Sequence, residues 1–137
     1  MVGSNDKIIK VGDRASCTKT ATEDVVKSLT LISEDFNPIH IDKGYAENTK
    51  FGRCIAHGLF CLGMISKIIG MDMPGEGSIF LNEKLNYKHP VYIGDTVTAY
   101  VEIEKIIEEK SLIEVKIECI NQKGIIVMDG TSLLKLI

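Results

Sequence analysis

The segment that most constrains the fold is the apolar stretch over residues 58–70, which is apolar on all sides when drawn as a helix. It contains Lys67 and is shorter than the roughly 20 residues that a bilayer-spanning helix requires. A helix of this kind needs cover on nearly every side, and a sheet wrapped around it would supply that cover. We therefore expect a buried central helix from Gly58 to Ile69, ended by Gly70.

The second half of the chain has the period of two that is typical of half-exposed strands. Apolar and polar residues alternate over residues 96–104 and again over 113–119. A further strand is expected from residue 125 onward and an earlier one over residues 78–87. Strands that follow one another this closely favour an antiparallel meander. The sequence thus predicts one α+β domain over residues 1–137, with helices first and antiparallel strands after them.

The first half is expected to form helices. Thr22 is a hydroxyl cap followed by two first-turn acids. The next apolar residues share one helical face: Val25, Val26, Leu29 and Ile32. Because Pro38 disfavours a helical conformation at the residue before it, this helix should stop near Asp35. A second short helix, capped by Asp42, should run through Ala46.

Composition bears on partners and compartment. Sixteen Lys and Arg residues against nineteen Asp and Glu give a net charge of −3 without a basic cluster, so nucleic acid is a poor partner. Residues 1–10 lack the continuous apolar region of a signal peptide, so we expect a cytoplasmic protein that does not enter a membrane. The cysteines should be reduced there, and most of them buried. They are Cys17, Cys54, Cys61 and Cys119.

The turn that carries Asp35 and His40 has the clearest chemistry. The two side chains flank Asn37 and Pro38 and are close enough in principle to hold one water between them, so the pair could move protons. An acid at the C-terminal end of a helix also opposes the helix dipole, and such a broken local rule often marks a functional site. The alternative stays open that Asp35 makes a turn through its own backbone and His40 is a partly buried polar residue.

His57 and Gly58 stand at the start of the central helix, where backbone N–H groups lack acceptors. Such an end can bind anions and developing oxyanions, and glycine lets a ligand carbonyl approach closely. The alternative is a simple helix entry. Gly63, inside the helix, needs only a close packing contact as its explanation.

Metal chemistry finds little support in the sequence. Cys54, His57 and Cys61 lack the spacing of a zinc site, and no fourth ligand is evident. There is also no GxGxxG, P-loop or GxSxG motif. We expect no metal, and these absences favour acid–base chemistry.

Several segments, in this order and spacing, resemble the MaoC-like (R)-specific enoyl-CoA hydratases. They are SEDFNPIHID, IAHG, PGEGSIF and KHPVYIGDTVTAYVEI. The resemblance covers most of the chain, although Lys43 and Cys54 stand where proline is common in the family. It implies the hotdog fold, an antiparallel sheet wrapped around one long central helix, paired as a homodimer or a dimer of dimers.

The resemblance also implies roles for individual residues. Asp35 and His40 fall on the family's hydration dyad, Gly58 on the glycine whose amide meets the thioester oxygen, and Ser66 on a serine that supports the aspartate. We further expect Asn37 and His57 among the substrate-binding residues.

The implied activity is reversible hydration of a short-chain trans-2-enoyl-CoA to an (R)-3-hydroxyacyl-CoA. It needs no cofactor, because coenzyme A is part of the substrate. Three isoleucines of the central helix are expected to shorten the acyl tunnel: Ile65, Ile68 and Ile69. The alternatives are a hotdog thioesterase, which releases free thiol, a (3R)-hydroxyacyl-ACP dehydratase, and a non-catalytic acyl-CoA-binding hotdog.

Overall fold

The structure of the protein is a computed structural model that describes residue 1 and residues 7–137. Residues 2–6, part of the stretch over which we expected no signal peptide, lie outside the described residues. The elements follow the order β1 (Arg14–Thr20), α1 (Glu23–Ser33), α2 (Pro38–Ile41), α3 (Lys43–Glu47), α4 (Leu59–Lys67), η2 (Ile68–Asp72), β2 (Ser78–Tyr87), β3 (Thr96–Ile107), η3 (Glu108–Lys110), β4 (Leu112–Asn121) and β5 (Ile126–Leu136).

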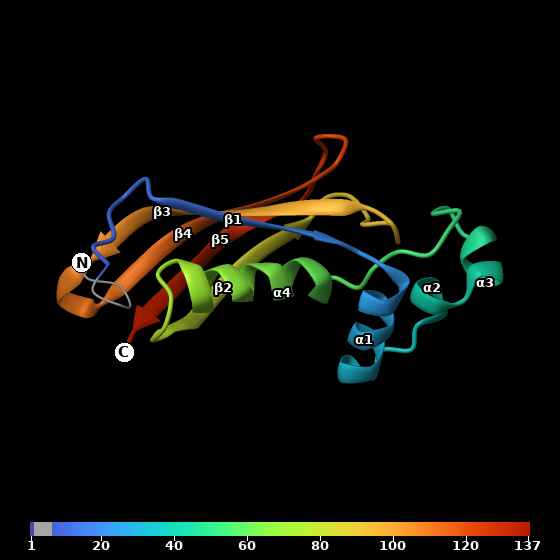
Figure 1. Cartoon of the computed structure of the whole chain (residues 1–137), viewed down its shortest axis with the longest axis horizontal. Coiled ribbons are helices and arrows are strands. Elements are labelled where there is room, and N and C mark those ends of the chain that lie inside the picture. The colour runs from blue at the N-terminus through green and yellow to red at the C-terminus, as the bar shows by residue number, and fades with distance from the viewer. Residues whose placement is uncertain (2–6) are drawn as a thin grey trace.

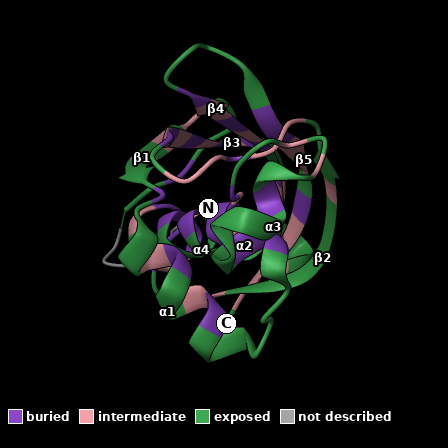
Figure 2. Cartoon of the chain, turned by 90° about the vertical axis from the view of Figure 1, so that its right-hand side faces the viewer, coloured by how far each residue is buried: buried purple, intermediate pink, exposed green. Residues whose placement is uncertain are grey.

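Five antiparallel strands form one sheet in the order β1-β3-β4-β5-β2. Figure 1 shows α4 along one face of the sheet, and the end-on view shows the strands curving around it (Figure 2). The inward-facing residues of β3 are fully buried: Val97, Ala99, Val101 and Ile103. The alternation in the sequence therefore predicted the buried face of β3 correctly. The α+β class and the hotdog arrangement are both confirmed.

The central helix runs further than predicted. It continues through Gly70 as the π-helical turn η2, and the chain becomes extended only at Met73. The prediction that Gly70 ends the helix is wrong, because a glycine does so by taking a left-handed conformation and Gly70 does not have a positive φ. Ile68 and Ile69 pack fully into the core on this last turn, which keeps the backbone wound against the sheet.

One side of α4 is not covered by the rest of the chain. Leu59, Gly63 and Ser66 are exposed, whereas the opposite side, including Cys61 and Ile65, is buried. A Cβ atom added to Gly63 would have no neighbour within 4 Å. The prediction of a close packing contact at Gly63 is therefore wrong within the single chain, as is the prediction of cover on nearly every side.

The helical segment before α4 differs from the prediction in two places. α1 has the expected N-cap, since Thr22 Oγ1 accepts from Val25 N at 3.2 Å, but Ile32 lies on its exposed side. The proline turn itself winds into the one-turn helix α2, which was not predicted, with Pro38 in its first turn. α3 begins as expected at the cap Asp42. β1 was also missed, because its edge position leaves it mostly exposed.

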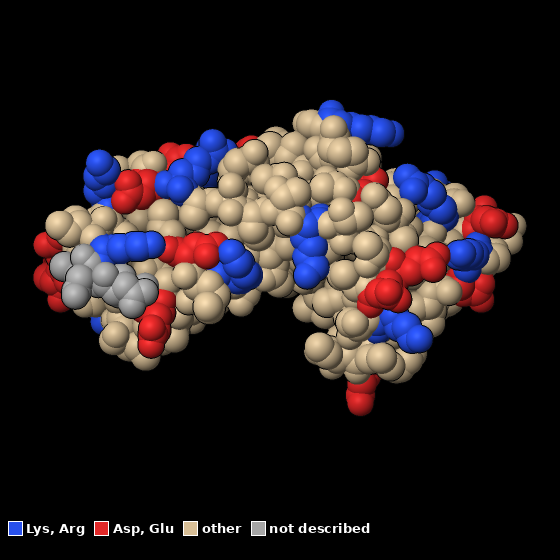
Figure 3. Space-filling view, in the orientation of Figure 1, with Lys and Arg blue, Asp and Glu red and all other residues tan. Residues whose placement is uncertain are grey.

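The surface carries both charges. Figure 3 shows Lys and Arg interspersed with Asp and Glu over the face in view, and an indentation below the region of α4. In the described part of the chain, no helix has the length and hydropathy to cross a membrane. All four cysteines are free thiols, and three of them are buried, as predicted.

Candidate active site

The turn between α1 and α2 holds Asp35. α1 ends at Glu34, whose left-handed conformation (φ 59°) redirects the chain. Asp35 N then donates to Ser33 Oγ at 3.1 Å, and Asp35 Oδ1 accepts from Asn37 N at 3.1 Å. Asn37 in turn caps α2 through its Oδ1 atom. The backbone turn proposed as the alternative role of Asp35 is therefore present, and it occupies only one carboxylate oxygen.

The other carboxylate oxygen faces His40. Asp35 Oδ2 lies 3.6 Å from His40 Nε2, and the His40 side chain is 10% exposed against 47% for Asp35. The Nδ1 atom of His40 lies 2.7 Å from Ile55 O. Because a carbonyl only accepts, Nδ1 carries the hydrogen, and the ring in its neutral form presents a lone pair at Nε2. Two acceptors thus face each other across a gap beside which one water could donate to both.

His57 lies against both residues. Its ring stacks on that of His40, with centroids 3.8 Å apart and an interplanar angle of 26°. Its Nε2 atom lies 3.2 Å from Asp35 O and 3.2 Å from Thr30 Oγ1. The other ring nitrogen, Nδ1, is buried and finds no partner among the described residues. The sequence did not single out Thr30 or Ile55, although a threonine four residues after Val26, on the buried side of α1, is a readable signal.

Gly58 begins α4 and leaves its backbone N–H without an acceptor among the described residues. The ring of Tyr87 covers the glycine, since an added Cβ would lie 2.8 Å from Tyr87 Cε1. Burial raises the pKa of the Tyr87 hydroxyl, and Cys61 and Glu83 add to this shift. The sequence did not identify Tyr87 as part of the site.

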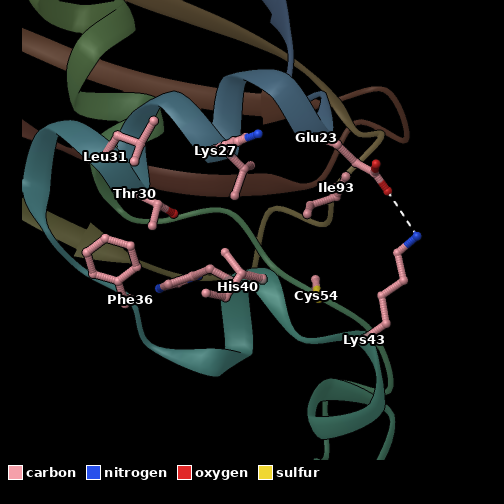
Figure 4. Close-up of a pocket in the computed structure, with 11 residues that line it drawn as sticks. Glu23, Lys27, Thr30, Leu31, Phe36, His40, Lys43, Cys54 and Ile93 are labelled. Carbon is pink, nitrogen blue, oxygen red and sulfur yellow. Dashed lines mark ion pairs between the residues drawn. The ribbon is translucent and has the colours of Figure 1, made fainter.

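Two pockets meet at His40. One, of about 440 Å³, opens beside the start of α4 and is lined among others by His40, His57, Gly58, Cys61 and Tyr87. The other, of about 370 Å³, lies between α1 and the α2 segment (Figure 4). Its lining is largely apolar, with Leu31, Phe36 and Ile93 around His40, and the ion pair of Lys43 with Glu23 (3.1 Å) stands at one end.

The residues that come together also form a possible metal-binding group. Asp35, His40 and His57 each offer one ligand atom, and these atoms lie within 4.8 Å of one another. This is not the Cys54, His57 and Cys61 set considered from the sequence. His57 Nε2–H is already donated to Asp35 O, so the group serves equally well as a hydrogen-bonded cluster without an ion.

Other predicted residues lie away from this cluster. Ser66 is exposed on α4, about 12 Å beyond Gly58 at 1.5 Å per residue, and in the described residues no hydrogen bond joins it to Asp35. The three tunnel isoleucines, Ile65, Ile68 and Ile69, are fully buried in the main core. They line neither of the two pockets at His40.

Comparison with known proteins identifies the family of the chain. Residues 7–123 match the family described as MaoC like domain. The chain is 39% identical over 124 residues to an (R)-specific enoyl-CoA hydratase of Rhodospirillum rubrum, a match that covers 90% of this chain and 85% of the relative. It is 36% identical over 128 residues to the (R)-specific enoyl-CoA hydratase of Aeromonas caviae, covering 93% and 96% of the two chains.

The solved structures give the same result. The (R)-hydratase from A. caviae involved in PHA biosynthesis superposes with a TM-score of 0.90 at 36% identity, over 94% of this chain and 98% of the other. Sequence, fold and the enzymes it is similar to therefore agree that this chain belongs to the MaoC-like family of hotdog hydratases and dehydratases and is a hydro-lyase.

Proposed function

We propose that the protein is an (R)-specific enoyl-CoA hydratase that adds water reversibly to short-chain trans-2-enoyl-CoA, with Asp35 and His40 as its catalytic dyad. One observation carries the proposal: Asp35 Oδ2 and His40 Nε2 lie 3.6 Å apart, each turned toward the other as an acceptor. The names of the hydratase relatives support the choice of substrate and of (R) product.

The dyad would act on a single water. A water beside the 3.6 Å gap can donate one hydrogen to the carboxylate and the other to the imidazole, which leaves an oxygen lone pair for attack. That oxygen forms the new bond to C3 of the enoyl group while the C2–C3 π electrons move toward the thioester. One dyad member accepts the water proton, and a proton is returned to C2. The sum is addition of H and OH across the double bond.

The start of α4 would stabilise the charge that this attack creates. As C3 is attacked, negative charge develops on the thioester oxygen. The N–H of Gly58, which has no acceptor among the residues that the structure describes, lies at the positive end of α4, and Gly58 borders the same pocket as His40. A thioester oxygen beside this amide would place C3 on the side of the dyad.

Short acyl chains are favoured by the packing along α4. An acyl chain that extended beyond the dyad into the core behind this helix would have to displace Ile65, Ile68 or Ile69, which are at most 1% exposed. Moving well-packed branched side chains is costly. We expect crotonyl-CoA and hexenoyl-CoA to have much higher kcat/KM than dodecenoyl-CoA, because each methylene that does not fit costs roughly 1–3 kcal/mol.

We further propose that the protein works as a homodimer, which could pair again. β2 is an edge strand whose apolar side chains Ile79, Phe80 and Leu81 are exposed, and such an edge favours pairing with another chain. A second copy of the chain would also bury the uncovered side of α4. A two-fold axis across two α4 helices would run them antiparallel and bring Ser66 of one copy toward the Gly58 end of the other. In this arrangement Ser66 of one copy would support the aspartate of the other copy's dyad.

The test is to follow the absorbance of the conjugated enoyl thioester of crotonyl-CoA, together with the configuration of the product and the release of free thiol. We expect the enoyl signal to fall, (R)-3-hydroxybutyryl-CoA to form and no thiol to appear. Thiol release would identify a thioesterase, and binding without turnover a non-catalytic acyl-CoA-binding protein. Turnover of an acyl carrier protein thioester with little turnover of the CoA thioester would identify an ACP dehydratase. The cytoplasmic location stays a prediction, which fractionation of expressing cells would test.

A further inference from the structure

We propose that His57 is a positioning residue that holds both members of the dyad, rather than a group that binds substrate. The inference rests on the proposed hydratase function. It deepens that function by assigning the buried imidazole that touches Asp35 and His40 at once.

The one N–H donor of the His57 ring is already used within the protein. Its Nε2–H donates to the Asp35 main-chain carbonyl, since a carbonyl only accepts, and Thr30 Oγ1 shares the same hydrogen. Its Nδ1 atom is buried. His57 lines the neighbouring pocket, but its N–H is already donated to Asp35 and Thr30. His57 contacts the dyad, and it is the dyad that would contact water.

Asp35 needs this support because its other backbone contacts are local. Ser33 and Asn37, two residues away on either side, hold its N–H and Oδ1. The side chain is half exposed, and the turn follows a left-handed residue at the end of α1. The bond from His57, 22 residues later in the chain, ties this turn to the start of α4. Without it, the Asp35 turn is free to move relative to Gly58.

The stack on His40 completes the arrangement. Ile55 O fixes one ring nitrogen of His40, which still leaves the ring free to tilt about that bond. The His57 ring, 3.8 Å away, blocks that tilt on one side. A phenylalanine at position 57 would stack as well and would avoid the unpartnered Nδ1 atom. The feature that only the histidine supplies is the Nε2–H donor.

Two substitutions separate these contributions. His57→Phe keeps a stacking ring and removes the donor, whereas His57→Gln keeps an N–H donor. For His57→Phe we expect kcat on crotonyl-CoA to fall about 10- to 100-fold, because a misplaced catalytic group costs on this order, with KM changed less than about threefold. His57→Gln should recover about tenfold of that loss. A rise in KM with kcat kept, or equal losses in both variants, would overturn the positioning role.

A readout without substrate keeps this proposal separate from the hydratase assignment. The amide signal of Asn37, which donates to Asp35 Oδ1, should shift or broaden in the NMR spectrum of His57→Phe and stay near its wild-type place in His57→Gln. An unchanged amide signal in His57→Phe would sink the inference. Loss of crotonyl-CoA turnover in the wild type would instead sink the proposed function and leave this measurement valid.

If His57→Phe does not fold, Thr30→Val is the alternative variant that tests the positioning role of His57. It removes the hydroxyl beside Nε2 and keeps the shape of a side chain that is buried on α1. We expect kcat to fall about threefold to tenfold and the Asn37 amide to move. Wild-type kcat together with an unmoved amide would count against the role of His57.

Discussion

The Nε2 atom of His40 lies 3.6 Å from the Oδ2 atom of Asp35, and backbone contacts rather than a bond between them keep the two atoms there. The His40 ring is held through its other nitrogen by Ile55 O, and the carboxylate through its other oxygen by Asn37 N. Each side chain thus uses one polar atom to hold its place in the fold and leaves the other facing its dyad partner. This division makes the pair ready to hold a water, and it makes the consequences of substitution predictable.

Replacing either member of the dyad should remove turnover and keep the fold. For Asp35→Asn and His40→Gln we expect kcat on crotonyl-CoA to fall by about 10²-fold or more, because each change removes an acid–base group. The circular dichroism spectrum should not change. Asp24→Asn, on the exposed side of the same helix α1, is the matched control and should retain wild-type kcat. Near-normal turnover in a folded Asp35 or His40 variant would exclude that residue from the dyad.

Gly58→Ala should lose both stability and turnover, for different reasons. The added Cβ meets the Tyr87 ring at 2.8 Å, so the ring must move. It also enters the space that a thioester oxygen needs beside the amide. Adding Tyr87→Ala removes the clash and leaves the Cβ in place. We therefore expect the double variant to regain the Tm lost in Gly58→Ala but not the lost kcat, measured by thermal melts and steady-state kinetics. Full recovery of kcat would argue against an oxyanion role for the Gly58 amide.

Gly130→Ala should destabilise the protein strongly. Gly130 lies in β5 with φ 156°, and a Cβ there would clash with the backbone oxygen of Lys84 on β2. Backbone cannot yield as a side-chain end can, so we expect a loss of about 3 kcal/mol in the free energy of unfolding. Urea denaturation of the pure variant measures it. A loss below about 1 kcal/mol would mean that the β2–β5 pairing adapts more easily than its register suggests.

Gly63→Ala should instead raise the free energy of unfolding of an isolated chain. Gly63 lies inside α4 with open space around it, and alanine is favoured over glycine in a helix by about 1 kcal/mol. If a second copy packs on this side of α4, the new methyl group will instead weaken the dimer. Unfolding measured across a range of protein concentrations separates the two results: a gain at every concentration would show that this side of α4 stays open.

The assembly prediction can be tested at the sheet edge. Leu81→Lys places a charge on the exposed face of the edge strand β2, and edge lysines oppose strand pairing. We expect wild type to sediment as a dimer or a dimer of dimers and the variant to shift toward monomer. Val11→Lys, in the exposed turn before β1 at the opposite edge of the sheet, is the control and should leave the mass unchanged. A wild type that is a fully active monomer below micromolar concentration would contradict the dimer.

Sequence-based prediction was weakest where an element departs from the regular strand alternation or from the usual signal for a helix end. The alternation in β3 located the strand and its buried face, since each residue faces the core or solvent by its place in the pleat. β1 has the same strand geometry but lies at an edge of the sheet, where most of its residues are exposed. Exposure there permits a largely polar sequence, and for this reason the strand was missed. The glycine at position 70 looked like a helix end and is not, because the buried isoleucines before it keep the helix against the sheet.

The sequence by itself determined four of the five strands, the central helix and the turn that carries Asp35 and His40, because period, caps and proline act between residues close together in the chain. Only the tertiary structure decided which groups distant in the chain hold the two residues. Ile55 reaches His40 across 15 residues, and His57 reaches Asp35 across 22 and Thr30 across 27. Such contacts depend on how α1, α2 and α4 pack together, and no local pattern records that packing.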